Sequence, residues 1–236
     1  MSMFDRLVAE QRRAAALGLL TQEGGPCRIK LCGMFRDEDI AALNEAGPDL
    51  CGFIFNFPKS HRNVTGSLAR QLFPQVSERI YKTLVLVDQP WQKAAYYTAS
   101  LGADIVQLHG KEDDDYMHAL RSRMHVGIIK AFTVRTQADV EAAKRSTADM
   151  VLLDAGQGSG TTFDWSLIEG VGACRPFMLA GGLGPDNVAE AIRTLHPWGV
   201  DMSSGIETNG VKDPLKMASA VSKVRECGRD ATRDVE

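Results

Sequence analysis

The stretch Arg28-Ile29-Lys30-Leu31-Cys32-Gly33 joins a short strand-like run to a thiol and a glycine. The stretch Val151-Leu152-Leu153-Asp154-Ala155-Gly156 repeats this design, with a carboxylate in place of the thiol. A short strand, a turn and a helix, in that order, form the repeating unit of parallel β-sheet proteins. The two stretches therefore predict an α/β fold and place a thiol and a carboxylate at two strand ends.

The same unit recurs along most of the chain. The strand-like runs lie near residues 28–32, 50–55, 82–87, 104–108, 127–132, 149–154, 177–180 and 199–203. Segments of helical composition between and after them include residues 37–46, 91–101, 136–146, 185–195 and 214–224. Eight such units in about 205 residues predict a closed (β/α)8 TIM barrel. The alternative is an open doubly wound sheet, but no G-x-G-x-x-G motif follows the first strand, and polar residues end nearly every strand.

The 236 residues are expected to form a single domain, because barrels of this kind reach that size. We expect a helical N-terminal extension over residues 1–26, the barrel over residues 27–227, and a polar tail over residues 228–236. A hydrophobic content of 44% and a charged content of 24% allow a large buried core.

Composition and charge argue against several classes of protein. The net charge of −3 gives no reason to expect a nucleic-acid partner, and no apolar stretch is long enough to span a bilayer. The five cysteines are irregularly spaced and form no C-x-x-C pair, which disfavours a disulfide framework and a zinc site. The first residues lack the apolar core of a signal peptide. We therefore expect a cytoplasmic protein.

Alternation along the strands selects candidate catalytic residues. Alternate residues of a barrel strand point inward, and the reactive end of such barrels lies where the strands end. Lys30 and Cys32 share one face of the first strand, and Asp154 ends the sixth. If these faces point inward, the thiol and the carboxylate supply a base and an acid at one site, and the lysine favours the thiolate. The alternatives are a small buried apolar role for Cys32 and a helix-capping or loop role for Asp154.

Glycine-rich turns follow the last two strands. They are Ala180-Gly181-Gly182-Leu183 and Ser203-Ser204-Gly205. Barrels of this kind bind phosphate there through backbone N–H groups. Together the turns predict a small phosphorylated substrate.

A third glycine-rich segment, residues 156–165, directly follows Asp154. Its composition predicts a mobile lid that closes on the substrate and excludes water. An ordinary surface loop is the alternative.

Two further side chains follow strands at the same end of the barrel. Arg62 follows the second strand and could bind a carboxylate through two hydrogen bonds, or it could be a solvated loop charge. His109 ends the fourth strand and could contact the substrate or serve a structural role.

In these residues the chain resembles the phosphoribosylanthranilate isomerase family, the (β/α)8 enzymes of tryptophan biosynthesis. The matching stretches occur in order from residue 28 to about residue 220. They are Lys30-Leu31-Cys32-Gly33, Gly52-Phe53-Ile54-Phe55, Ser60-His61-Arg62-Asn63-Val64, Val106-Gln107-Leu108-His109-Gly110, Leu153-Asp154, Gly158-Ser159-Gly160, Phe163-Asp164-Trp165, Leu179-Ala180-Gly181-Gly182-Leu183, Gly199-Val200-Asp201-Met202-Ser203-Ser204-Gly205-Ile206-Glu207 and Asn209-Gly210-Val211-Lys212-Asp213-Pro214.

The resemblance implies an Amadori rearrangement of N-(5-phosphoribosyl)anthranilate, an aminoaldose, to an aminoketose. It implies that Cys32 is the general base and Asp154 the general acid, with no metal and no organic cofactor. The implied substrate-binding residues are Arg62 on the anthranilate carboxylate, Asp201 on the ribose hydroxyls, and Lys30, His109 and Gly158. The implied phosphate-binding residues are Gly181, Gly182, Ser203, Ser204 and Gly205. A monomer or a homodimer is expected.

Two segments depart from the family pattern. Met34-Phe35 replaces a Leu-Thr-like pair, and Thr161 replaces a lysine of the lid, which removes one positive charge from the barrel opening.

Other readings stay open. The indole-glycerol-phosphate synthase of the next pathway step would use Lys30 as an acid, but no glutamate ends a neighbouring strand. A histidine-pathway aminoaldose isomerase would carry an aspartate in place of Cys32. A phosphate-ligand sensor on a degenerate barrel would have no turnover.

Overall fold

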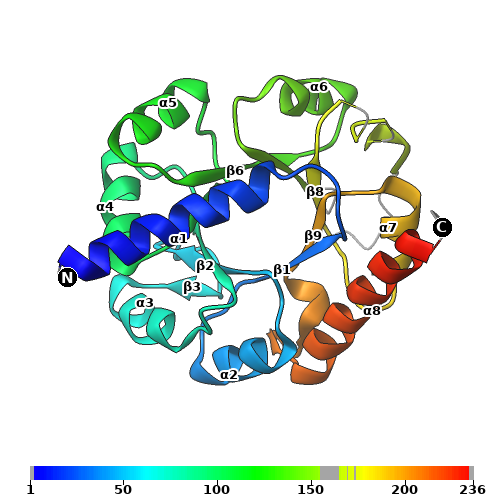
Figure 1. Cartoon of the computed structure of the whole chain (residues 1–236), viewed down its shortest axis with the longest axis horizontal. Coiled ribbons are helices and arrows are strands. Elements are labelled where there is room, and N and C mark those ends of the chain that lie inside the picture. The colour runs from blue at the N-terminus through cyan, green and yellow to red at the C-terminus, as the bar shows by residue number, and fades with distance from the viewer. Residues whose placement is uncertain (1–2, 155–164, 169, 173, 234–236) are drawn as a thin grey trace.

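A computed structural model describes residues 3–154, 165–168, 170–172 and 174–233. Its centre is a closed barrel of parallel strands in the order β1-β9-β8-β7-β6-β5-β4-β2, with β1 paired again to β2 (Figure 1). The eight strands are β1 (Arg28–Cys32), β2 (Leu50–Phe55), β4 (Tyr81–Leu86), β5 (Ile105–Leu108), β6 (Gly127–Thr133), β7 (Met150–Asp154), β8 (Phe177–Ala180) and β9 (Gly199–Met202). The predicted (β/α)8 barrel is thus confirmed.

Helices and short elements surround the barrel. The helices of the outer layer are α2 (Asp37–Ala46), α3 (Gly66–Leu72), α4 (Trp91–Leu101), α5 (Asp114–Arg123), α6 (Gln137–Arg145), α7 (Val188–Leu195) and α8 (Pro214–Arg233). The described part of the chain also contains the 3₁₀ turns η1 (Phe73–Gln75), η2 (Trp165–Ile168) and η3 (Ser204–Ile206). The short strand β3 (Asn63–Val64) pairs with β2, and β10 (Glu207–Thr208) pairs with β11 (Val211–Lys212) in a hairpin after η3.

The start of α7 differs from the expected range 185–195. The helix begins at Val188, because the side chain of Asn187 binds the preceding loop. Its carbonyl accepts a hydrogen bond from the backbone N–H of Gly184 at 2.9 Å, and its amide donates to the carbonyl of Gly182 at 3.1 Å. Pro185 therefore lies in this loop and not in the first helical turn.

Strand alternation divides the core into two clusters. Side chains on the outer face of the strands pack against the helices, while those on the inner face form a second cluster inside the barrel. Leu50, Ile129 and Leu152 belong to the inner cluster. Lys30 lies opposite Leu50 in the register of β1 and β2, and Asp154 is two residues after Leu152, so both share the inward face.

The N-terminal helix α1 (Met3–Thr21) lies across one end of the barrel (Figure 1). Its Ala16 and Leu20 are buried in the inner cluster, together with the residues that begin several strands. Arg12 forms a salt bridge with Asp104 at 2.9 Å. The helix therefore covers the end of the barrel where the strands begin, opposite the end that holds Cys32 and Asp154. None of the helices in the described residues is long and apolar enough to cross a membrane.

Candidate active site

Lys30 and Asp201 form a buried ion pair below the end of the barrel. The Lys30 Nζ lies 2.9 Å from Oδ1 and 3.0 Å from Oδ2 of Asp201, and the two residues face each other in the register of β1 and β9. Burial acts to lower the pKa of Lys30, but the charges of Asp201 and Cys32 outweigh it and raise that pKa. Both predicted substrate contacts are thus bound to each other.

Cys32 lies two residues further along the same inward face of β1. A Cβ atom at Gly52, its neighbour on β2, would lie 2.6 Å from the Cys32 Sγ and 2.9 Å from the Lys30 Nζ. Glycine at this position therefore leaves the space that the thiol and the ammonium occupy. Burial raises the pKa of the Cys32 thiol, and the nearby Lys30 ammonium opposes this without cancelling it. The expected effect of Lys30 is present, but burial has the larger effect on the pKa of the thiol.

Asp154 ends β7 and lies beside His109, which follows β5. The His109 Nε2 is 3.7 Å from the Asp154 Oδ2, and both side chains are partly exposed. The amide nitrogen of Gln107 lies 2.9 Å from the His109 Nδ1. Because an amide nitrogen only donates, this contact leaves the proton of a neutral imidazole on Nε2, toward Asp154. The structure thus brings Asp154 and His109 together.

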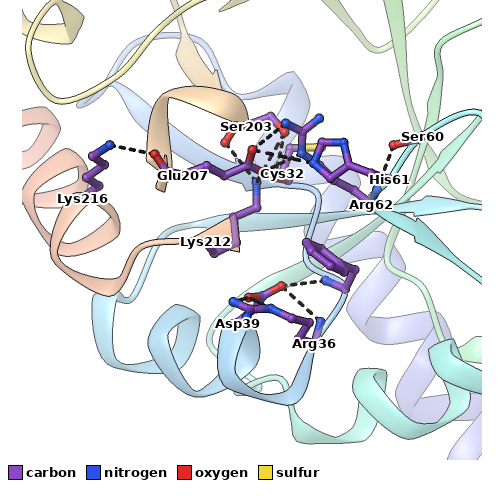
Figure 2. Close-up of polar contacts among 11 residues, drawn as sticks. Cys32, Arg36, Asp39, Ser60, His61, Arg62, Ser203, Glu207, Lys212 and Lys216 are labelled. Carbon is purple, nitrogen blue, oxygen red and sulfur yellow. Dashed lines mark hydrogen bonds and ion pairs between the residues drawn. The ribbon is translucent and has the colours of Figure 1, made fainter. Parts of the chain in front are cut away.

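Arg62 is held by Glu207, a residue outside the predicted site (Figure 2). The Arg62 Nε lies 2.6 Å from Oε1 of Glu207, and Nη2 lies 2.7 Å from Oε2. The Lys212 Nζ lies 2.7 Å from the same Oε1 and donates to the backbone carbonyl of Ser203 at 3.0 Å. Burial opposes the ionisation of Glu207, but the hydrogen bonds from Arg62 and Lys212 outweigh it and lower its pKa to about 2.

The turn between Glu207 and Lys212 carries a sequence signal that could have predicted their pairing. Asn209 and Gly210 have φ angles of 53° and 78°, as a type I′ hairpin turn requires. This Asn-Gly turn forms the hairpin of β10 and β11, in which Glu207 lies opposite Lys212. The pair could therefore have been placed side by side from the sequence, but not beside Arg62.

The two predicted phosphate turns meet at the ends of β8 and β9. A Cβ atom at Gly184 would lie 3.0 Å from the carbonyl oxygen of Gly205, and one at Gly205 would overlap the carbonyl of Leu183. A pocket of about 420 Å³ is lined here by Gly182, Gly184, Pro185, Asp186, Asn187, Gly205, Leu215, Lys216 and Ser219.

The other predicted phosphate ligands flank this pocket without lining it. Gly181 precedes Gly182 with a φ of 99°, and Ser203 and Ser204 precede Gly205. The hydroxyl of Ser203 donates to the backbone carbonyl of Cys32 at 3.2 Å, which joins the end of β9 to the end of β1.

The predicted lid lies almost wholly outside the described residues. This applies to Gly158, to Thr161 and to the rest of residues 155–164. Trp165 begins η2 and packs against the outer cluster. Among the residues that the structure describes, no group of three or more His, Cys, Asp or Glu side chains could hold a metal ion.

Comparison with known proteins decides the family. A family model described as N-(5'phosphoribosyl)anthranilate (PRA) isomerase matches residues 29–223. The chain belongs to this family. The N-(5'-phosphoribosyl)anthranilate isomerase of Thermoanaerobacter sp. (strain X514) is 36% identical over 203 residues, which cover 84% of this chain and 98% of the relative. The resemblance seen in the sequence is thus confirmed, and the chain is an isomerase of tryptophan biosynthesis.

Solved structures of phosphoribosyl anthranilate isomerases share the fold. The Thermotoga maritima enzyme has a TM-score of 0.78 and 32% identity, with 85% of this chain and 99% of that chain covered. A second structure, a complex with reduced 1-(o-carboxyphenylamino)-1-deoxyribulose 5-phosphate, has a TM-score of 0.74 and 31% identity, with the same coverage of 85% and 99%.

The PRA isomerase match begins inside β1, so the helix α1 lies outside it. The Met34-Phe35 pair, which we expected to depart from the family pattern, lies inside the match. Met34 is fully buried in the outer cluster, and the ring of Phe35 packs edge-on against His61 at a centroid distance of 6.2 Å. The pair therefore fills space behind the end of β1.

Proposed function

We propose that this chain converts N-(5-phosphoribosyl)anthranilate to 1-(2-carboxyphenylamino)-1-deoxyribulose 5-phosphate with Asp154 as general acid and Cys32 as general base. One observation carries the assignment. Cys32 on β1 and Asp154 on β7 both point inward at the same end of the barrel, and the two strands between them, β9 and β8, end in the glycine turns. A substrate with its phosphate on these turns would lie between the acid and the base.

The rearrangement needs two proton transfers on the sugar. Asp154 gives a proton to the ring oxygen, the C1–O bond breaks, and the aniline nitrogen forms an iminium with C1. The iminium makes the C2 proton acidic, and the Cys32 thiolate removes it to leave an enolamine. Return of a proton to C1 and loss of one from the C2 hydroxyl give the ketone. Each transfer by a positioned group contributes about 10²–10⁴-fold to the rate.

The environment of Lys30 distinguishes this reaction from the synthase alternative. A lysine that acts as general acid must reach the substrate and give up its proton. Lys30 is fully buried, and both oxygens of Asp201 lie within 3.0 Å of its Nζ. This supports a role in holding Asp201 and stabilising the thiolate of Cys32. The same proposal includes a cytoplasmic location, a monomeric or homodimeric state, and binding of the substrate phosphate by the two glycine turns.

A fluorescence assay of freshly generated phosphoribosylanthranilate tests the proposal. We expect Cys32→Ala and Asp154→Asn each to lower kcat/KM by roughly 10²–10⁴-fold with the fold intact. Cys51→Ala is the matched control, because Cys51 is also buried but lies in the outer cluster. Full activity in either site variant would remove the acid–base assignment. A wild-type protein with no acceleration over the spontaneous background would overturn the function itself.

A further inference from the structure

Glu207 is the buried centre of a charge cluster beside the catalytic thiol. Its side chain is only 6% exposed, and it joins three segments of the chain. The carboxylate binds Arg62, which is 145 residues away in the sequence, and Lys212 of its own hairpin. Its backbone carbonyl accepts a hydrogen bond from the Lys216 Nζ at 2.7 Å. The cluster therefore fixes Glu207 from both sides before any substrate binds.

The contact with Arg62 uses one particular edge of the guanidinium. Glu207 accepts from Nε and from Nη2, at 2.6 and 2.7 Å. A guanidinium has five N–H donors, so both N–H groups of Nη1 and one of Nη2 are left. These form a second two-pronged edge, which matches the two oxygens of a carboxylate.

The charges of the cluster favour an anion at that second edge. Arg62 and Lys212 are cations and Glu207 is an anion, so the three together carry one positive charge. Gly33 allows the arrangement, because a Cβ atom there would lie 2.5 Å from the Cδ of Arg62 and 3.3 Å from the Nζ of Lys212. Arg62 is thus held close to the end of β1 by contacts that, among the residues that the structure describes, leave its outer donors available.

We propose that Glu207 is a positioning residue that orients Arg62 so that its second edge binds the aryl carboxylate of the substrate. This rests on the proposed isomerase function. Glu207 itself does not touch the substrate. It removes the rotational freedom of a long side chain before binding, which lowers the entropic cost of binding the carboxylate. A purely structural tie between the β10–β11 hairpin and the loop after β2 would predict no dependence on that carboxylate.

A ligand pair separates the two roles. The first ligand is the reduced carboxyphenylamino-deoxyribulose phosphate, and the second is the same molecule without the aryl carboxylate. In calorimetric titration, we expect Glu207→Gln to lower the affinity for the first ligand roughly tenfold and the affinity for the second less than about twofold. In the assay, KM for phosphoribosylanthranilate should rise more than kcat falls. In an Arg62→Met background, Glu207→Gln should have no further effect on the first ligand.

Two further variants complete the experiment. Glu141→Gln removes a carboxylate from an exposed ion pair with Lys144 on α6 and should leave both affinities unchanged. Glu207→Asp keeps the charge but shortens the reach to Arg62, and it replaces Glu207→Gln in the experiment if that variant does not fold. We expect it to lose less affinity than Glu207→Gln, and again only for the ligand with the aryl carboxylate.

The outcomes are distinct for the two proposals. If Glu207→Gln lowers the affinity for both ligands equally, or for neither, the positioning role is overturned. Turnover by the wild-type protein still supports the isomerase function in that case. A wild-type protein that neither turns over the substrate nor binds either ligand overturns the isomerase proposal, and the positioning role with it.

Discussion

Cys32, the proposed general base, has surroundings that act on its ionisation in opposite directions. Burial raises the pKa of the thiol, Lys30 lowers it, and Asp201 raises it. A thiolate base works only when deprotonated, so activity should rise with pH toward the raised pKa of Cys32. The site therefore buries the thiol and offsets part of this burial with two ammonium groups, those of Lys30 and Lys212.

The pH profile of kcat/KM should report this balance. In Lys30→Met the thiolate loses the ammonium that stabilises it, and we expect the rising limb to move to higher pH. The double variant Lys30→Met/Asp201→Asn also removes the anion that opposes ionisation of Cys32. The rising limb of its profile should therefore lie between those of Lys30→Met and the wild type. An unchanged profile in Lys30→Met would show that this ammonium does not set the ionisation of Cys32.

At the scale of elements, the strands could be predicted better than the contacts between distant segments. That Cys32 shares a strand face with Lys30, and Asp154 with Leu152, follows from the period of two along β1 and β7, but the sequence left open whether these faces point inward. The pairing of Arg62 with Glu207 could not be predicted, because it joins a loop after β2 to a hairpin after β9. The start of α7 was misplaced because Asn187 binds Gly184 and holds Pro185 in a loop.

Strand β2 contributes to the site through Gly52, which has no side chain. A Cβ atom at Gly52 would displace the Sγ of Cys32 and the Nζ of Lys30 and not the backbone. We expect Gly52→Ala to lower kcat roughly 10²-fold, because displacements of about 1 Å at reacting groups cost this much. Gly18→Ala is the control, since a Cβ atom there meets no atom within 4 Å. Wild-type kcat in Gly52→Ala would show that the thiol tolerates displacement.

At the scale of the whole molecule, the candidate site lies at one end of the barrel and α1 covers the other end. A helical N-terminal extension was predicted over residues 1–26, but not where its helix would lie. Its position depends on packing with residues far along the chain, such as Trp198, whose indole N–H donates to the backbone carbonyl of Gln22 at 3.2 Å. A Cβ atom at Gly127 would lie 2.8 Å from the Cδ1 of Leu20, so the start of β6 also fits this helix.

This division predicts that α1 stabilises the fold without affecting turnover. Leu20 is 1% exposed in the inner cluster, so Leu20→Ala should lower the free energy of unfolding by about 2–5 kcal/mol, the usual cost of such a cavity. Leu7 lies on the same helix but is 53% exposed, so Leu7→Ala should change it by no more than about 0.5 kcal/mol. Urea unfolding measures both, and kcat at 25 °C should equal the wild-type value in each, because the helix and the thiol lie at opposite ends of the barrel. A fall in kcat for Leu20→Ala in the folded protein would show instead that packing at the closed end reaches the catalytic end through the inner cluster.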